Sequence, residues 1–186
     1  MRIAVSGSHR TGKSTLVAAM AAAMPAYAVV EEPYHLMEED GYLFSHPPSV
    51  EDFEAQLERS IREVREAGPD TLFDRCPVDL LAYLAVHDDA SSADVERWLP
   101  AVRAAVGTLD AVVLVPVEAC DRIARPSGDD DGDWREKVDE TLRERLVEDS
   151  CDLALKVIEV EGDVARRLRT VLRTLDLPAG AEVAHE

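Results

Sequence analysis

The chain is poor in the features that mark secreted and membrane proteins. It has no apolar run near the ~20 residues that a helix needs to cross a bilayer. Strand-like residues follow Arg2 at once, where a signal peptide would carry its apolar region. Cysteine is scarce, and Cys76, Cys120 and Cys151 show no Cys-x-x-Cys spacing, which is typical of reduced structural thiols. We therefore expect a cytoplasmic protein without disulfides.

Positive charge is also in short supply. Acidic residues outnumber basic ones 38 to 20, which gives a formal net charge of -18 at pH 7. Nonspecific binding to nucleic acid or to an anionic membrane depends on a basic surface, so this composition argues against both kinds of partner. Any polyanionic substrate would have to be met by locally concentrated positive charge. The sequence also lacks metal-site spacings of His, Cys and Asp, and it lacks a Ser-His-Asp signature.

The sequence does contain a regular alternation of two kinds of segment. Its 186 residues, 46% hydrophobic and 31% charged, fit one globular domain, which we place at 1–178 with a flexible tail at 179–186. Near-continuous apolar runs predict strands that are covered on both faces. These runs lie at 2–7, 27–33, 71–75, 110–118 and 154–162. Such strands, separated by helices, predict an α/β fold with a parallel sheet.

The helices between these strands are marked by caps and prolines. The clearest one follows Ser49, where Ser-x-x-Asp forms a capping box ahead of a regular apolar face. Pro77 suits the first turn of another helix, and a helix over 95–102 should be kinked near Pro100. Further helices are expected at 12–24, 134–146 and 163–175.

Two segments lack a clean period. The segment 34–48 predicts a loop with at most one helical turn, and the polar, turn-rich segment 120–137 predicts a mobile surface segment. Tyr34, Tyr42 and Phe44 in the first segment would either stack on a planar ligand or anchor the loop. The histidines His35 and His46 would either line the same pocket or be solvated.

The stretch between the first strand and the first helix matches the Walker A pattern Gly-x-x-x-x-Gly-Lys-Ser. Glycines let the backbone wrap so that several N–H groups point at one phosphate, and the dipole of the following helix adds positive potential there. Lys13 would reach the β- and γ-phosphates of ATP or GTP, and the Ser14 hydroxyl would ligate Mg²⁺. We expect the nucleotide to contact Gly7, Ser8, His9, Arg10, Thr11, Gly12, Lys13, Ser14 and Thr15. Together with the strand pattern, this motif predicts a three-layer α/β/α P-loop NTPase fold with a five-stranded parallel sheet.

A carboxylate at the end of a buried strand is the usual second element of such a magnesium site. The segment Thr-Leu-Phe-Asp places Asp74 at that position. A helix cap or a structural ion pair is the alternative interpretation. Because ligands in open parallel sheets lie beyond the carboxyl ends of the strands, other functional side chains should follow the remaining strands.

The order of these motifs resembles the P-loop nucleoside and nucleotide kinases, in particular the deoxyribonucleoside kinases and thymidylate kinase. Ribosylnicotinamide kinase domains are similar too. The resemblance rests on GSHRTGKST, on Glu-Glu-Pro after the second strand, on Asp-Arg-Cys-Pro-Val-Asp after the third, and on an arginine-bearing stretch after the fourth; it covers about residues 1–170. It implies ATP-dependent phosphoryl transfer to a small hydroxyl or phosphate acceptor, most simply a nucleoside or nucleotide. A homodimer is compatible with it.

The resemblance also assigns acceptor-side residues. In deoxyribonucleoside kinases a Glu-Pro pair after the second strand supplies the base near the acceptor hydroxyl, and Glu32-Pro33 matches it. We favour Glu32 over Glu31, because adjacent side chains at a strand end point apart. Arg75 would clamp the acceptor oxygen or its phosphate. Asp-Arg-Cys stands where deoxyribonucleoside kinases have Glu-Arg-Ser and is nearer to thymidylate kinase, which leaves nucleoside and monophosphate acceptors open. Gln56 aligns loosely with a base-reading glutamine, although an exposed helical glutamine is the simpler interpretation.

The arginine-bearing stretch carries Arg122 and Arg125. In the kinases that it resembles, a lid here brings arginines onto the transferring phosphates and shields them from water. The resemblance therefore implies a lid near 121–135 with both arginines as catalytic groups. The aspartates within 129–133 would contact a basic residue, hold a cation, or keep the open lid solvated.

Two other functions stay open at this stage. The first is a nucleotide-binding switch or slow NTPase that acts through a protein partner, although the guanine-reading Asn-Lys-x-Asp motif is absent. The second is a kinase for an antibiotic or another specialised metabolite, which would differ mainly in the segment 34–48.

Overall fold

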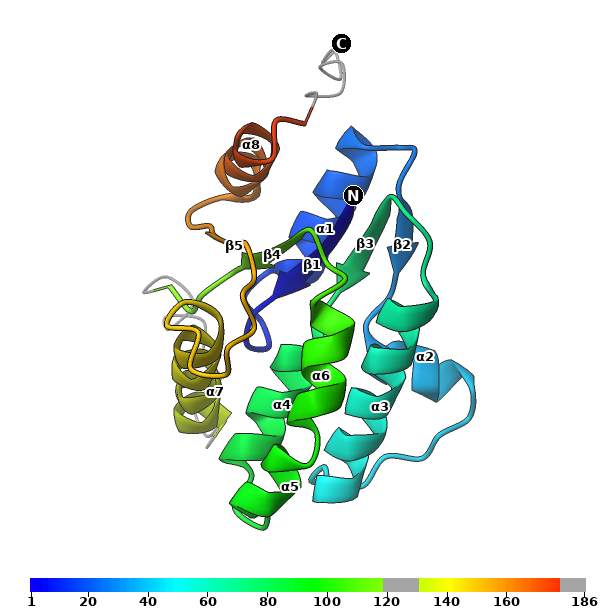
Figure 1. Cartoon of the computed structure of the whole chain (residues 1–186), viewed down its shortest axis with the longest axis vertical. Helices are drawn as coiled ribbons and strands as arrows, with labels where there is room; N and C mark the ends of the chain where they lie inside the picture. Colours follow the sequence, from blue (N-terminus) through cyan, green and yellow to red (C-terminus); the bar gives the residue numbers. More distant parts are fainter. Residues whose placement is uncertain (119–130, 178–186) are drawn as a thin grey trace.

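Five parallel strands form the centre of the molecule (Figure 1). In this computed structural model the described residues are 1–118 and 131–177. The strands are β1 (Arg2–Ser6), β2 (Ala28–Val30), β3 (Thr71–Asp74), β4 (Ala111–Leu114) and β5 (Val157–Glu159). They pair in the order β2-β3-β1-β4-β5, and every neighbouring pair is parallel. The predicted five-stranded parallel sheet is confirmed.

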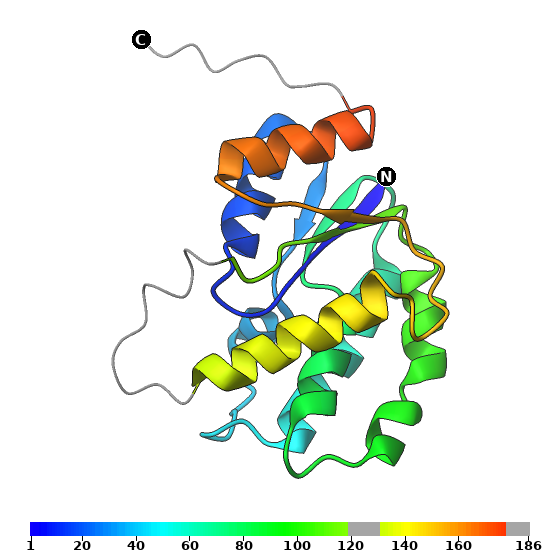
Figure 2. The same ribbon diagram turned by 90° about the vertical axis from the view of Figure 1, so that its left-hand side faces the viewer.

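Helices cover both faces of this sheet, as Figure 2 shows from the side of strand β5. They are α1 (Lys13–Ala23), α2 (Pro33–Glu39), α3 (Val50–Glu66), α4 (Pro77–Val86), α5 (Ser92–Glu96), α6 (Leu99–Val106), α7 (Asp131–Leu146) and α8 (Val164–Thr174). Helices α1 and α8 pack on one face, and α3, α4, α6 and α7 pack on the other. The predicted three-layer α/β/α arrangement is therefore confirmed. Within the described residues, no helix is long and apolar enough to cross a membrane.

The interior residues of the central strands β1 and β4 are apolar because both faces of these strands meet a helical layer. In β1, Ile3 and Val5 face the core under α1 and α8, whereas Ala4 between them belongs to the core on the other side. Strand β4 follows the same alternation. Side chains in a strand point alternately to opposite faces, so two-sided burial removes the polar positions of a half-exposed strand.

Two expected helix starts are confirmed. The Ser49 side chain accepts a hydrogen bond from the Asp52 amide at the start of α3, and the Asp52 carboxylate accepts one from the Ser49 amide. This reciprocal capping box stabilises the helix by about 1 kcal/mol. Helix α4 begins with Pro77, and its N-cap residue Cys76 donates its amide to Asp79.

The structure corrects two expectations about element boundaries. The second strand ends at Val30, and Pro33 opens helix α2, which runs to Glu39 and is longer than the single turn that was predicted; residues 40–48 have no helix, as expected. Proline has no amide to donate and its fixed φ suits a first helical turn, which favours this start. The region 95–102 holds two helices, α5 and α6, rather than one kinked helix, and Pro100 lies in the first turn of α6.

A third correction concerns the polar segment 120–137. Residues 131–137 belong to helix α7, so this part of the predicted surface segment and of the lid near 121–135 is regular helix. Its polar composition conceals the helix because most of its charged residues face solvent. The two lid arginines, Arg122 and Arg125, lie outside the described residues, as do Cys120, most of the lid and the tail at 179–186.

Candidate active site

The carboxyl ends of β1, β2 and β3 lie at the same end of the sheet and border a cavity of about 340 Å³. The cavity is lined by His9, Arg10, Gly12, Lys13, Ser14, Thr15, Glu32, Tyr34, His35 and Arg75. These residues follow three different strands. The expectation that functional side chains gather just beyond the strand ends is met here. Gly7, Ser8 and Thr11 are not among the lining residues, and the side chains of Ser8 and Thr11 are buried.

The loop from Gly7 to Gly12 has a glycine with a positive φ at each end, a conformation that other residues rarely adopt. Gly7 has a φ of 151°, and a Cβ added to it would overlap the carbonyl oxygen of Val115. Gly12 has a φ of 85° and is the N-cap residue of α1, so the helix opens at Lys13. Because the helix begins at the cavity, its free N–H groups and its dipole point toward a bound anion.

The carbonyl groups of this loop are held by cations from other elements. Arg135 of α7 donates its Nε to the carbonyl oxygen of His9 at 2.9 Å and one Nη to that of Arg10 at 3.2 Å. Arg167 of α8 donates an Nη to the carbonyl oxygen of Thr11 at 2.7 Å. With their carbonyl oxygens bonded to these guanidinium groups, the loop residues are fixed in one conformation.

Two buried side chains of α4 hold amides of the same loop. The Asp79 carboxylate accepts the amide of Gly7 at 2.8 Å, and the Tyr83 hydroxyl accepts that of His9 at 2.8 Å. Asp79 is fully buried, which raises its carboxyl pKa, whereas Arg75 and Lys13 nearby oppose this shift. Sequence analysis missed Asp79 and Tyr83. The only local signal was the spacing of Cys76 and Asp79, which marks a helix cap.

Lys13 points back into the loop. Its ammonium group donates to the carbonyl oxygen of Ser8 at 2.7 Å, and the side chain is buried. Burial, reinforced by the positive charge of Arg75, lowers the pKa of Lys13 to about 8. A polyphosphate in the cavity would supply the negative charge that this ammonium group requires.

Glu32 and Arg75 form an ion pair that lines the same cavity, and an Nη of Arg75 also donates to the carbonyl oxygen of Gly7 at 3.4 Å. Glu32 is the N-cap residue of α2, directly before Pro33, and it accepts a hydrogen bond from the Nε of Arg75. Burial alone would raise the pKa of Glu32, but the charge and hydrogen bond of Arg75 hold it below its ordinary value. Glu31 is exposed and does not line the cavity, so the structure places the favoured glutamate at the site.

Arg75 itself is tightly enclosed. Its guanidinium lies over the Tyr83 ring at 5.2 Å from the centroid and 3.8 Å from the Asp79 carboxylate. Its φ of 98° is unusual for a residue with a side chain and costs about 1–3 kcal/mol. Burial would lower the pKa of Arg75, but Tyr83, Glu32 and Asp79 together raise it. Arg75 is therefore a fixed positive charge in a strained position, which is typical of functional sites.

Asp74 and Ser14 lie where a magnesium ion would be held. The Oδ1 atom of Asp74 is buried and has no hydrogen-bond partner among the described residues. Burial raises the pKa of Asp74, and the Ser14 hydroxyl partly offsets this by hydrogen bonding to the carboxylate. A buried carboxylate oxygen without a partner fits a ligand held directly or through water. The described residues contain no cluster of three or more His, Cys, Asp or Glu side chains suited to a metal ion; Mg²⁺ typically needs one or two carboxylates plus substrate phosphates.

The aromatic residues around α2 contact one another and α3, which fits the anchoring role, while Tyr34 also reaches the cavity. Tyr34 lines the cavity, and its ring stacks on Phe44 with centroids 4.4 Å apart. The Tyr42 hydroxyl donates to Asp52 at 3.1 Å and so anchors the chain after α2 to α3. His35 lines the cavity and His46 does not.

Gln56 is buried on α3, with an exposed fraction of 5%, so the interpretation as an exposed glutamine is wrong. Its amide nitrogen donates to the carbonyl oxygen of Asp52 one turn earlier, at 3.2 Å. Gln56 does not line the cavity.

The five-stranded parallel sheet and the loop with glycines at both ends between β1 and α1 together define a P-loop fold. The chain belongs to the family described as AAA domain, whose model matches residues 2–167. A search of curated proteins finds no match.

Solved structures of NadR and of two kinases share this fold. NadR in complex with NR superposes with a TM-score of 0.69 at 16% identity, covering 98% of this chain and 51% of NadR. Deoxyadenosine kinase from M. mycoides with bound dATP superposes with a TM-score of 0.64 at 17% identity, covering 95% of this chain and 100% of the kinase. Thymidylate kinase from Candida albicans superposes with a TM-score of 0.62 at 12% identity, covering 94% of this chain and 90% of the kinase. The chain thus spans about half the length of NadR, and the predicted kinase-like fold is confirmed.

Proposed function

We propose that the protein is a kinase that transfers a phosphoryl group from ATP or GTP to a nucleoside or nucleotide. The observation that carries this proposal is the Glu32–Arg75 pair, which lines the same cavity as Lys13 and the start of α1. A nucleotide switch needs the phosphate loop but has no need of an ionised carboxylate in that cavity. The similar structures include NadR in complex with NR, deoxyadenosine kinase with bound dATP, and thymidylate kinase, which supports the same class of acceptor.

The donor side of the cavity fits a polyphosphate with a bound Mg²⁺. Lys13 and the first amides of α1 would bind the terminal phosphates, because both present positive charge at the cavity. Ser14 and Asp74 would hold Mg²⁺, as the partnerless Oδ1 of Asp74 suggests. Once bound, the ion would neutralise charge on the phosphate oxygens.

The acceptor side fits proton removal from a hydroxyl group. Glu32 stays ionised near neutral pH because Arg75 lowers its pKa, so it can accept the proton of an acceptor hydroxyl. That proton moves to Glu32 as the acceptor oxygen bonds to the γ-phosphorus and the bond to the nucleoside diphosphate breaks. Arg75 orients Glu32 and balances its charge. For Arg122 and Arg125 we keep the predicted role of shielding and contacting the transferring phosphate from a lid.

Turnover of ATP with and without acceptors tests this proposal. Purified protein with Mg²⁺ and ATP is assayed alone and then with pools of nucleosides, nucleoside monophosphates and pyridine ribosides. We expect ADP to form rapidly only with one of these pools, and the pool is then divided to find the acceptor. Steady hydrolysis that no acceptor accelerates, and that Glu32→Gln leaves unchanged, would instead support the nucleotide switch or slow NTPase.

A further inference from the structure

The charge of this acidic protein is distributed very unevenly. Helices α1 and α8, which form one layer, contain five basic residues and no acidic residue. Subtracting these five charges from the total of -18 leaves -23 for the rest of the chain. Such an uneven distribution of charge favours association between surfaces of opposite sign.

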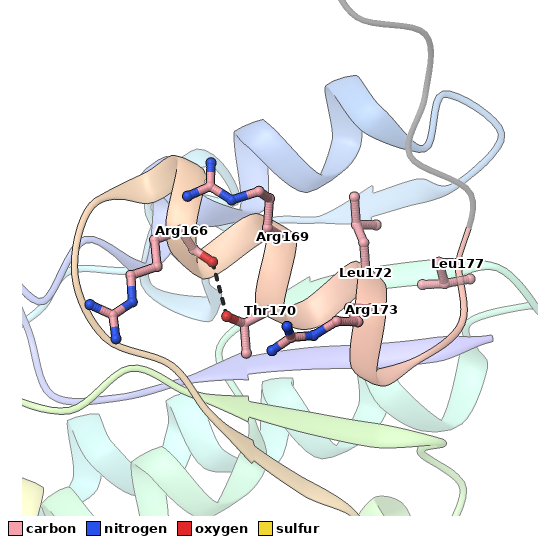
Figure 3. A pocket seen from close by; sticks show the side chains of 6 residues that line it. All are labelled: Arg166, Arg169, Thr170, Leu172, Arg173 and Leu177. Carbon is pink, nitrogen blue, oxygen red and sulfur yellow. Dashed lines mark hydrogen bonds between the residues drawn. The ribbon is translucent and has the colours of Figure 1, made fainter.

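Three of the basic residues border a groove on the outer side of α8, with a volume of about 520 Å³ (Figure 3). Its lining consists of Arg166, Arg169, Thr170, Leu172, Arg173 and Leu177. Arg169 and Arg173 are exposed and form no ion pair with any described residue. Arg167 differs from them, because it is buried and bonds to Glu118 and the phosphate loop. We call this surface the arginine groove.

Helix α7 carries a surface of the opposite sign. A groove of about 390 Å³ is lined by Val117, Glu136, Asp139, Glu140, Arg143, Glu144 and Glu148. Its single cation, Arg143, is already paired with Glu159. Glu140, Glu144 and Glu148 form no ion pair with any described residue. We call this surface the glutamate groove.

Both helices flank the same edge of the sheet. Strand β5 is the outermost strand, and in Figure 2 α8 (orange) lies above it and α7 (yellow) below it on the side that faces the viewer. The arginine groove and the glutamate groove therefore belong to helices on one side of the molecule, separated by the sheet edge.

We propose that a second copy of this chain docks on this side, with the arginine groove of each copy against the glutamate groove of the other. A two-fold axis along the sheet edge produces both contacts at once, because it exchanges the two faces of the sheet. A nucleic acid or an anionic membrane laid over the arginines would meet the carboxylates of α7 beside them and be repelled. A second copy satisfies both charge patterns, and the proposal does not depend on the catalytic function.

Charge exchange between the two grooves tests this directly. One variant carries Arg169→Glu with Arg173→Glu, and the other carries Glu140→Arg with Glu144→Arg. At an ionic strength of about 0.15 M, we expect the wild-type chain to sediment with twice the mass of the 20.4 kDa chain. Each variant alone should dissociate, with a dimer dissociation constant raised about 100-fold or more. An equimolar mixture should recover a 1:1 dimer, because both contacts are then complementary again.

The matched control is Arg62→Glu with Arg65→Glu, which makes the same charge change at exposed positions of α3. It should leave the dimer intact. A wild-type chain that sediments as a monomer, a mixture that fails to associate, or a control that dissociates as fully as the α8 variant would each overturn the proposal. The mixing experiment also detects a variant that fails to fold, since such a variant cannot re-form a dimer.

Discussion

Arg75 donates a hydrogen bond to Glu32 although 43 residues separate them in the sequence. The bond joins the carboxyl end of β3 to the last residue of the β2–α2 connection. It holds a carboxylate in the cavity that the phosphate loop also lines. In the proposed function this pair supplies the acceptor side of the site.

Glu32→Gln should slow phosphoryl transfer by about 100-fold or more, which is the usual contribution of a general base. Nucleotide affinity should change by less than about threefold, because Glu32 does not lie in the phosphate loop and contributes to the transition state only. Acceptor-dependent kcat and calorimetric Kd for an ATP analogue measure the two effects. Glu31→Gln is the matched control and should retain full activity, since Glu31 is exposed; equal losses in both variants would contradict the assignment.

Asp74→Asn should abolish most of the increase in nucleotide affinity that Mg²⁺ produces. In the wild type the metal should tighten the ATP analogue, and the variant should bind the metal–nucleotide complex about 10- to 100-fold more weakly. Titrations with and without Mg²⁺ compare the two states. Asp88→Asn, at an exposed position after α4, serves as the control. If the variant responds to Mg²⁺ as the wild type does, Asp74 is a structural residue.

Nucleotide affinity should fall as the pH rises through about 8. Burial and Arg75 lower the pKa of Lys13 to about 8, and a bound polyphosphate favours the charged ammonium form. Binding above this pH must therefore take up a proton, whereas below it Lys13 is already charged. Calorimetry in buffers of different ionisation enthalpy should show proton uptake that grows above about pH 8. An affinity that stays constant up to about pH 9.5 would show that Lys13 titrates normally.

Arg135→Met should weaken nucleotide binding by about 10-fold, because it frees the carbonyl groups of His9 and Arg10 within the phosphate loop. The loss of stability should be about 1–3 kcal/mol, the usual cost of leaving buried acceptors unpaired. Lys137→Met, at an exposed position one half-turn later on α7, is the control. A positioning role for Arg135 predicts that Kd changes far more than it does in the control.

Gly7→Ala should lower the free energy of unfolding by more than about 2 kcal/mol and abolish nucleotide binding. The added Cβ overlaps the Val115 carbonyl oxygen, and the φ of 151° is unfavourable for alanine. Gly68→Ala is the comparison, because a Cβ there meets nothing within 4 Å. Urea unfolding measures the free energy of unfolding of both variants. Equal values for the two variants would show that the loop rearranges to accept the Cβ, which would contradict the prediction.

The parts of the site that could be predicted are those encoded in short stretches. The phosphate loop is one continuous motif, and Asp74 and Glu32 could be placed because parallel strands end at the same edge. Asp79, Tyr83, Arg135 and Arg167 escaped prediction because they meet the loop across 72, 74, 126 and 156 residues. A buried arginine in a polar helix looks like any other charged surface residue.

Two local errors have identifiable causes. The start of helix α7 was predicted at Trp134, three residues after its actual start at Asp131, because the polar residues 131–133 were assigned only to the surface segment. Gln56 was placed at the surface by its residue type, whereas its position three residues after Phe53 puts it on the buried face of α3. In both cases the helical period was a better guide than composition.

The sequence by itself determined the alternation of strands and helices and the loop that binds phosphate, because periodicity and glycine placement act over a few residues. Only the tertiary structure decided which glutamate lines the cavity, which arginines hold the loop and which charged helices flank the edge strand β5. These relationships depend on how distant segments pack together, and a linear pattern does not contain the packing.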